Sequence, residues 1–267
     1  MTPPTAEIGI FGGSGFYEWL DGAEEVRVDT PYGTPSGPLA VADVAGRRVA
    51  FMPRHGPKHE IPAPFVNYRA NVWAMRQLGV RRLIGPSAVG SLQPDLHPGD
   101  LMICDQFIDR TTGRADTYYR GPDVVHISAA DPYCPELRAL AGRIAGQQSL
   151  RWRPAGTVVV VQGPRFSTRA ESRWYSRMGW DIVGMTQYPE VILARELEMC
   201  YLNLCLVTDY DAGLEGAPEV GAVQAHDVMR VLAENIVRVR DLLAATIPMI
   251  PAEPSCNCQR SLEAARL

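Results

Sequence analysis

Two aspartates, Asp209 and Asp211, directly follow the apolar run at residues 204–207. Side chains two positions apart on a strand point to the same face, so a strand here would place both carboxylates together at its end. Paired carboxylates can bind a metal ion, share a proton or contact a ligand. A hydrophilic turn without a chemical role fits the same residues. The pair is therefore the first candidate site, with its chemistry open.

Two further stretches carry groups that could hold an anion. Residues 12–15 (GGSG) follow an apolar run; their glycines let backbone N–H groups approach a phosphate, and Ser14 adds a hydroxyl. Arg54 and His55 follow a second run and offer a guanidinium fork and an imidazole donor. The spacing matches neither GxGxxG nor GxxxxGK[ST], which argues against the common nucleotide-binding loops. A tight turn and a surface turn explain the same residues.

Aromatic, hydroxyl and sulfur side chains follow two other predicted strands. Phe166 and Ser167 lie in "GPRFSTRAE", where the aromatic ring could stack on a planar base. Met185 and Thr186 lie in "MTQYPE", where the methionine could pack on a sugar and the hydroxyl could donate to an anion. Ordinary alternatives are a core phenylalanine beside a helix cap and a methionine that fills a gap.

The composition excludes several classes of function. The chain of 267 residues is 46% hydrophobic and 21% charged, with a net charge of −4. No basic stretch indicates nucleic acid or an anionic membrane as a partner. The N-terminus lacks the basic and apolar regions of a signal peptide, and no apolar run is long enough to span a bilayer. We therefore expect a cytoplasmic protein.

Short β-rich runs alternate with helical patterns along the chain, which indicates an α/β fold. We expect one domain over residues 1–267, with a mixed central β-sheet flanked by helices and a Pro- and Cys-containing tail from about residue 248. Ligands in such folds gather on the loops at the strand ends. The clearest expected strands lie at 7–11, 157–161 and 200–207, and the clearest helices at 65–78, 136–149, 189–199 and 228–243.

Six cysteines fall into two groups. Cys104, Cys134, Cys200 and Cys205 stand among apolar neighbours and are typical of small buried side chains. The tail carries Cys256-Asn257-Cys258, whose spacing differs from the C-x-x-C of redox sites. A redox pair and two ordinary thiols both remain open. No second Cys or His pair lies nearby in the sequence, so we expect no metal site.

Seven stretches, which include the candidate sites above, together resemble the trimeric purine nucleoside phosphorylase superfamily, especially its members that cleave 5′-methylthioadenosine. Each stretch alone is a modest match, but the set is specific and covers nearly the whole chain. The matching stretches are "IGIFGGSG" (8–15), "MPRHGPKHEIPAPFVNYRANVWAM" (52–75), "SAVGSL" (87–92), "PGDLMICDQFIDRT" (98–111), "VQGPRFSTRAES" (161–172), "MTQYPEVILAREL" (185–197) and "VTDYDAG" (207–213).

The resemblance implies a nucleoside phosphorylase fold, a homotrimer and a pentosyltransferase reaction. In that reaction phosphate attacks C1′ of 5′-methylthioadenosine, giving adenine and 5-methylthioribose 1-phosphate. Phosphate is a co-substrate, and neither a metal ion nor an organic cofactor is implied. A broader activity on adenosine or on 6-oxopurine nucleosides is the alternative. Such chemistry requires an anion site below the sugar and a proton donor at the departing purine.

The resemblance also implies roles for individual residues. The phosphate site corresponds to Ser14, Arg54, His55, Ser87, Ala88 and Thr186. The purine and ribose site corresponds to Phe166, Ser167 and Met185, and the catalytic carboxylates to Asp209 and Asp211. We expect Asp209 to face N7 and Asp211 to face the exocyclic amine, which predicts a preference for aminopurines, since family members that prefer 6-oxopurines usually carry Asn at the position of Asp209.

The pocket for the 5′ substituent is the least determined part. Alignment on Val228 places Ala225 there, whereas a shift of one residue places His226 there and would admit a 5′-hydroxyl. His59 resembles a residue that lines this pocket, and His126 resembles one that reaches a neighbouring subunit. The Cys-x-Cys of the tail resembles a pair that forms a disulfide in some members of the superfamily.

Overall fold

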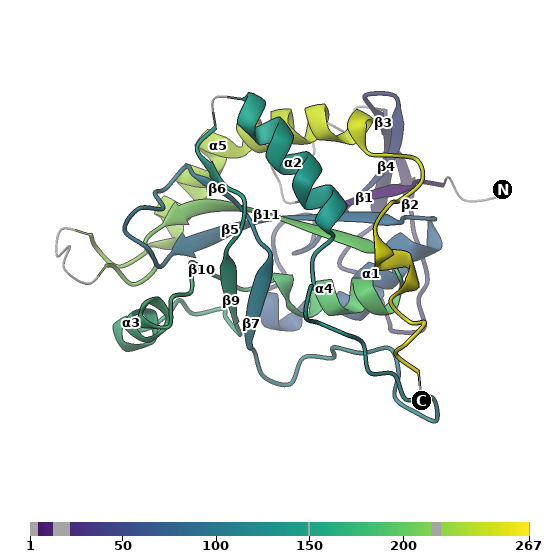
Figure 1. Cartoon of the computed structure of the whole chain (residues 1–267), viewed down its shortest axis with the longest axis horizontal. Helices are drawn as coiled ribbons and strands as arrows, with labels where there is room; N and C mark the ends of the chain where they lie inside the picture. Colours follow the sequence, from purple (N-terminus) through teal and green to yellow (C-terminus); the bar gives the residue numbers. More distant parts are fainter. Residues whose placement is uncertain (1–4, 13–21, 149, 215–219, 267) are drawn as a thin grey trace.

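A mixed β-sheet organises the computed structural model, which describes residues 5–12, 22–148, 150–214 and 220–266. Within these residues eleven strands join in one sheet, and helices cover both of its faces (Figure 1). The strands are β1 (Ile8–Gly12), β2 (Glu24–Val26), β3 (Leu39–Val44), β4 (Arg47–Pro53), β5 (Arg82–Ser91), β6 (Leu101–Ile103), β7 (Gln106–Arg110), β8 (Trp152–Arg153), β9 (Thr157–Val161), β10 (Ile182–Gly184) and β11 (Cys200–Asp209). The helices are α1 (Tyr68–Gln77), α2 (Pro135–Gln147), α3 (Arg169–Arg177), α4 (Gln187–Glu196) and α5 (Ala225–Thr246), with short 3₁₀ helices η2 (Ala63–Phe65), η3 (Ile247–Met249) and η4 (Asn257–Arg260).

The strand order confirms the expected mixed sheet. Hydrogen-bonded neighbours run in the order β2-β3-β4-β1-β5-β10-β9-β7, while β11 pairs with β5 and β6 and β8 pairs with β6. Strands β4, β1, β5 and β11 are parallel where they pair, whereas β10 runs antiparallel to β5 and parallel to β9. The carboxyl ends of β4, β1, β5 and β11 therefore meet at one edge, which is the edge where ligands bind in α/β folds.

Two apolar layers pack on the two faces of the sheet. Helices α1 and α4 cover one face, and α2 and α5 cover the other (Figure 1). Strand β11 shows the alternation because it is almost entirely buried. Side chains at 201, 205 and 207 join the α1–α4 layer, and those at 200, 202, 204 and 206 join the α2–α5 layer. Odd-numbered residues of β11 thus face the α1–α4 layer, and even-numbered residues face the α2–α5 layer.

Local sequence determines several of the element ends. Ala45 and Gly46 connect β3 and β4 with φ values of 49° and 79°, the left-handed conformation that a tight hairpin turn requires. Thr168 caps α3: its hydroxyl accepts from the Glu171 N–H and the Glu171 carboxylate accepts from the Thr168 N–H. The helix cap is therefore Thr168 and not the adjacent Ser167.

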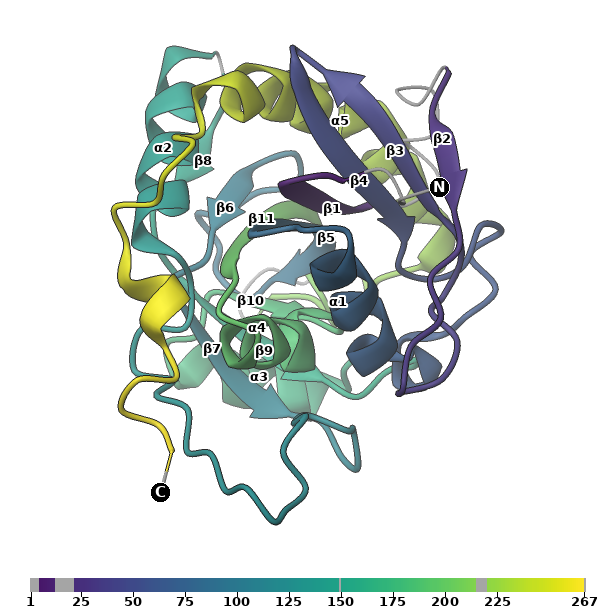
Figure 2. The same ribbon diagram turned by 90° about the vertical axis from the view of Figure 1, so that its right-hand side faces the viewer.

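The tail after α5 lies along the surface of the body. It runs past α2 toward the C-terminus (Figure 2). Ser255 donates from its N–H and hydroxyl to Glu136 at 2.5 Å, and the Arg82 guanidinium donates to the Pro251 carbonyl at 3.1 Å. Near its end, the Ala265 carbonyl accepts from the His126 N–H at 2.8 Å. These contacts fix the tail between α2 and the loop that carries His126.

Candidate active site

The predicted site residues gather along β5. Arg54 lies beside Gly85 and Asp209 lies beside Gly90, five residues further along β5. A Cβ at Gly85 would be 3.2 Å from Arg54 Nη2, and a Cβ at Gly90 would be 2.9 Å from Asp209 Oδ1. The hydroxyl of Ser87, between them, lies 3.0 Å from the amide of Gln187 at the start of α4. One strand thus brings together groups from the ends of β4, β10 and β11.

Arg54 is buried and paired rather than exposed in a surface turn. Its guanidinium donates to both oxygens of Glu190, with 3.0 Å for Nη2 to Oε2, and to the Pro86 carbonyl at 3.0 Å. Tyr201 donates its hydroxyl to the same carboxylate at 2.7 Å. Burial alone would lower the pKa of Arg54, but the Glu190 carboxylate outweighs it and raises the pKa. The arginine therefore stays charged and rigidly oriented.

His55 has one ring nitrogen fixed by the backbone. Its Nδ1 lies 2.9 Å from the Ile61 carbonyl, which can only accept, so Nδ1 carries the hydrogen. Burial and the positive charge of Arg54 lower the pKa of His55 to about 4. The ring is therefore neutral near pH 7, and Nε2 holds a lone pair. The Nδ1–H is thus already used by the Ile61 carbonyl, and Nε2 is available to accept a hydrogen bond.

The two hydroxyls expected at the phosphate differ in their surroundings. The Ser87 hydroxyl accepts from the side-chain amides of Gln187 and Asn203, at 3.0 and 3.2 Å, and belongs to a buried polar network. Thr186 begins α4 and is 6% exposed, and its hydroxyl has no hydrogen-bond partner among the described residues. A buried hydroxyl without a partner carries a free-energy cost that a bound ligand can remove.

The two aspartates come together by a turn and not by strand alternation. The register of β11 shifts between Val207 and Asp209, and Asp211 lies beyond the strand with a φ of 48°. The Asp209 carboxylate accepts from the Asp211 N–H and from the Thr208 hydroxyl, each at 2.7 Å. The expectation of two side chains on one strand face is therefore wrong in its mechanism, although both residues lie beside Gly90.

Both carboxyls have a pKa above that of an exposed aspartate. Burial raises the pKa of Asp209, and the hydrogen bonds from Thr208 and from the Asp211 N–H only partly offset this. Burial likewise raises the pKa of Asp211, against the hydroxyls of Ser167 and Ser172. Ionised carboxylates cost free energy in such surroundings, so both groups favour the neutral form more than an exposed aspartate does.

The predicted purine and ribose residues lie at the same edge. Ser167 borders Asp211, and Phe166 next to it is 37% exposed. Met185 packs against Gly163, where a Cβ would lie 2.6 Å from the methionine sulfur, and Gly163 has a φ of 67° that favours glycine. The loop after β9 and the loop after β10 therefore meet at Met185.

Five predicted residues are not part of this arrangement in the described structure. Ser14 lies outside the described residues. His59 is exposed with its ring 4.6 Å from that of His55, and His126 lies with the tail. Ala225 and His226 begin α5 and are both exposed, although the Val223 N–H just before them donates to the Asp211 carbonyl at 2.9 Å.

Comparison with known proteins fits this geometry. The sequence profile of the phosphorylase superfamily matches residues 7–248. The chain belongs to this superfamily. S-methyl-5′-thioadenosine phosphorylase from Thermofilum pendens is 53% identical over 97% of this chain and 98% of its own length. Purine nucleoside phosphorylase from Streptomyces coelicolor is 52% identical over 96% of this chain and 94% of its own length. The family indicated by the seven stretches is thereby confirmed.

Solved structures of relatives share the fold of this phosphorylase. A methylthioadenosine phosphorylase sourced from an antarctic soil metagenomic library matches with a TM-score of 0.91 and 39% identity, over 98% of this chain and 93% of that one. Methylthioadenosine phosphorylase from Schistosoma mansoni in complex with adenine matches with a TM-score of 0.88 and 34% identity, over 97% and 98%.

The sequence did not single out the groups that hold this site of the phosphorylase in place. Arg114 donates to the carbonyls of Met185 and Gln162, at 2.8 and 2.9 Å, and so joins the loops after β9 and β10. Glu190 and Gln187 stood inside a stretch already examined for its hydroxyl and its sulfur. A buried charge must find a partner, so the glutamate beside a predicted anion site was the available signal.

Two surface cavities of this phosphorylase lie elsewhere. One of about 460 Å³ is bordered by Gly99, Arg151 and Asn235, and one of about 550 Å³ by Trp73, Glu196 and Leu262. Neither is lined by a predicted site residue. None of the described helices has both the length and the apolar character that crossing a membrane would require.

Proposed function

We propose that this chain catalyses the phosphorolysis of 5′-methylthioadenosine to adenine and 5-methylthioribose 1-phosphate. The observation that carries the proposal is the pair of carboxyls at the end of β11, both with raised pKa. Asp209 is half-buried and Asp211 is buried, and both lie beside β5, the strand that carries Ser87 and borders Arg54. An acid at the leaving base and an anion site on the same strand are what the reaction needs. The relatives named as methylthioadenosine phosphorylases support the substrate.

Phosphate would bind among Ser14, Arg54, His55, Thr186 and the segment Ser87-Ala88. The unpartnered Thr186 hydroxyl is available as a donor, and the three hydrogen bonds of Arg54 use three of its five N–H groups. His55 accepts through Nε2, so it complements the O–H of monohydrogen phosphate rather than a bare oxygen. This set of groups selects a protonated phosphate and orients its free oxygens toward C1′.

Asp209 would protonate N7 as the bond from C1′ to N9 breaks, since charge develops on the purine and a neutral carboxylic acid can relieve it. The Thr208 hydroxyl donates to the ionised carboxylate and so lowers the pKa of Asp209, but it can also accept from the protonated form. It lies 2.7 Å from Asp209 Oδ2 and 3.3 Å from the Val89 carbonyl, and it has a single hydrogen. When Oδ2 is protonated it donates to the hydroxyl, which then donates to Val89. Thr208 is thus a positioning residue for the proton.

Asp211 would accept a hydrogen bond from the 6-amino group of adenine. A 6-oxopurine would place a carbonyl against this carboxylate, an unfavourable contact unless the carboxyl is protonated. Phe166, Ser167 and Met185 would line the base and the ribose. We therefore propose a preference for aminopurine nucleosides.

A neighbouring subunit would complete the pocket for the 5′ substituent in a homotrimer. His126 is exposed in the single chain, where it is available to a partner, and His59 is exposed beside His55. Ala225 and His226 begin α5, just after Val223, whose N–H donates to the Asp211 carbonyl. Both are therefore candidates for the pocket wall that distinguishes a 5′-methylthio group from a 5′-hydroxyl. We place the enzyme in the cytosol, and the proposed reaction uses phosphate as co-substrate and no other cofactor.

A broader purine nucleoside phosphorylase is the second candidate. The relative from Streptomyces coelicolor that carries this name is 52% identical, as similar as the methylthioadenosine phosphorylases. His226, one residue into α5, is the group that would admit a 5′-hydroxyl if it faced the pocket.

Three nucleosides separate the candidates. The test is cleavage of methylthioadenosine, adenosine and methylthioinosine, each with and without phosphate. Chromatography measures the base that is released. Methylthioadenosine should react fastest and only with phosphate. Faster cleavage of methylthioinosine would contradict the aminopurine preference, and release of base without phosphate would indicate a hydrolase.

A further inference from the structure

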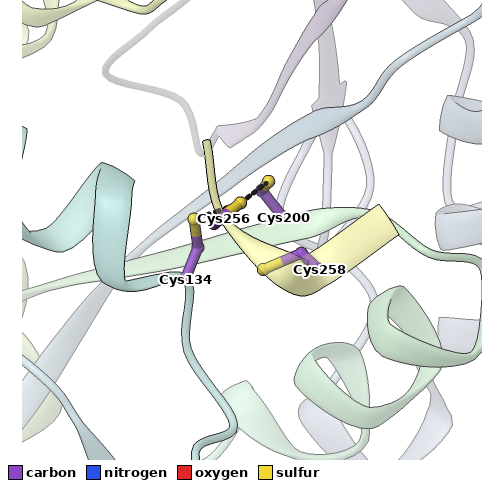
Figure 3. A group of neighbouring side chains, drawn as sticks. All are labelled: Cys134, Cys200, Cys256 and Cys258. Carbon is purple, nitrogen blue, oxygen red and sulfur yellow. Dashed lines mark hydrogen bonds between the residues drawn. The ribbon is translucent and has the colours of Figure 1, made fainter. Parts of the chain in front are cut away.

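Four cysteines far apart in the sequence meet on the face of the sheet covered by α2 and α5. They are Cys134 at the start of α2, Cys200 at the start of β11, and Cys256 and Cys258 in the tail (Figure 3). All four sulfur atoms lie within 4.8 Å of one another. Cys256 is half-buried and the other three are buried. The expectation that no second thiol pair lies near Cys-x-Cys is therefore wrong, because the fold supplies it.

Several independent contacts hold these sulfurs together. The Cys134 N–H donates to the Tyr201 carbonyl at 2.9 Å, which joins the start of α2 to the start of β11. Glu136, on the first turn of α2, accepts from both the N–H and the hydroxyl of Ser255, which directly precedes Cys256. The cluster is thus positioned by the backbone of three elements and does not depend on contacts between the thiols.

The distances fit a bound ion better than covalent bonds. Cys256 Sγ lies 3.6 Å from Cys134 Sγ and 3.4 Å from Cys200 Sγ, whereas a disulfide requires about 2.05 Å. Cys256 Sγ lies between the other two sulfurs, and all four cysteines are free thiols (Figure 3). A tetrahedral ion with metal–sulfur bonds of about 2.3 Å needs sulfurs about 3.8 Å apart. That separation lies within the range of the cluster.

A backbone donor and a buried arginine lie beside the cluster, and both favour thiolates. The Leu137 N–H in the first turn of α2 donates to Cys134 Sγ at 3.5 Å. Arg82 is opposite Cys200 in the β5–β11 pairing and is 3% exposed, although the Glu136 carboxylate 3.7 Å away offsets part of its charge.

We infer that Cys134, Cys200, Cys256 and Cys258 bind one Zn²⁺ ion as a structural site. Zinc favours four thiolates in a tetrahedron, and four protein ligands leave no open position for catalysis. Each thiol binds as a thiolate and releases its proton, so no oxidant or reductant is needed. The ion joins the tail to α2 and β11. Because β11 has ten residues, the site lies about 30 Å from the aspartates.

The test is the zinc content of the reduced enzyme. We expect the full chain, produced with added ZnCl₂ and purified with a non-chelating phosphine reductant, to contain about one zinc per chain by elemental mass spectrometry. Replacement of zinc by Co²⁺ should give thiolate-to-cobalt charge-transfer absorption and the intense visible bands of a tetrahedral site. The double variant Cys256→Ser, Cys258→Ser should lose at least tenfold in zinc content and lack these bands.

Cys104→Ser provides the matched control. Cys104 is buried and its sulfur lies 3.4 Å from that of Cys205, but this pair lies outside the four-cysteine cluster, so its zinc content should equal that of the wild type. Substoichiometric zinc in the reduced wild type, or equal zinc in the double variant, would overturn the proposal. So would mass spectrometry that finds the four thiols joined as disulfides in enzyme purified anaerobically.

Discussion

The two ends of β11 are built from different chemistry. The carboxyl end leads to Asp209 and Asp211, beside the α1–α4 layer that contains Arg54, Glu190 and Tyr201. The amino end begins at Cys200, whose side chain belongs to the opposite layer and meets three other sulfurs. The carboxyl end holds oxygen atoms and charge at the proposed substrate site, and the amino end holds sulfur beside the tail. The length of β11 thus keeps the proposed catalytic site apart from the proposed zinc site, and the alternation of its side chains places the two sites on opposite faces of the sheet.

Asp209→Asn should have the largest effect and should leave the sulfur end unchanged. Loss of the carboxylic acid at N7 is expected to lower kcat/KM for methylthioadenosine by about 10²–10⁴-fold, the usual contribution of a general acid. Steady-state kinetics measures this, and the zinc content serves as the control for an intact opposite end. Unchanged turnover would separate the aspartate pair from catalysis.

Glu190→Gln tests whether charge stabilises the carboxyl end. The change leaves Arg54 buried without its counter-charge, which should lower the free energy of unfolding by about 3–5 kcal/mol. Tyr201→Phe is the matched control: it removes one hydrogen bond to the same carboxylate and should cost about 1 kcal/mol. Urea denaturation measures both, and equal costs for the two variants would refute the distinction.

Zinc should act on stability and not on turnover. Free zinc at about 100 times its dissociation constant should raise the free energy of unfolding by about 2.7 kcal/mol. The reduced protein is compared with and without a chelator by thermal unfolding, and kcat/KM should stay within about twofold because the two ends are about 30 Å apart. A parallel loss of activity in chain that is still folded would show that the ends are coupled.

Thr208→Val should produce the smallest shift, in the pH profile. The Thr208 hydroxyl lowers the pKa of Asp209, so its removal raises that pKa further. Activity that requires protonated Asp209 is lost as pH rises through this pKa. The alkaline limb of kcat/KM should therefore move to higher pH by about one unit, and Thr208→Ser should restore it. A limb that moves to lower pH would contradict the assigned role.

The sequence predicted elements and chemistry better than it predicted contacts. Apolar runs such as 157–161 and 200–207 indicated strands because both faces of these strands are buried. Strand β7 was not predicted, because Gln106–Arg110 is partly exposed and has no apolar alternation. The motifs indicated the residue types of the site, but the partners Glu190, Asn203 and Arg114 come from elements that meet only in the fold.

The cysteine cluster was also not predictable from the sequence. Cys134, Cys200 and Cys256 each have local surroundings typical of an ordinary small side chain or a tail thiol. Sequence spacing can identify metal ligands when they stand on one turn or hairpin, and it cannot when three distant segments each contribute one or two. The register of β11 against β5 and the Glu136–Ser255 contact determine the cluster, and neither is visible in the sequence.

The left-handed backbone at Asp211 restricts how this enzyme can be redesigned. With a φ of 48°, position 211 readily accepts Asp, Asn or Gly, while Val, Ile or Thr would add conformational strain before any contact with the base is considered. Position 209 closes a strand and carries no such restriction. Backbone conformation therefore limits the substitutions available at 211, whereas at 209 the limit is the proposed role of the carboxylic acid.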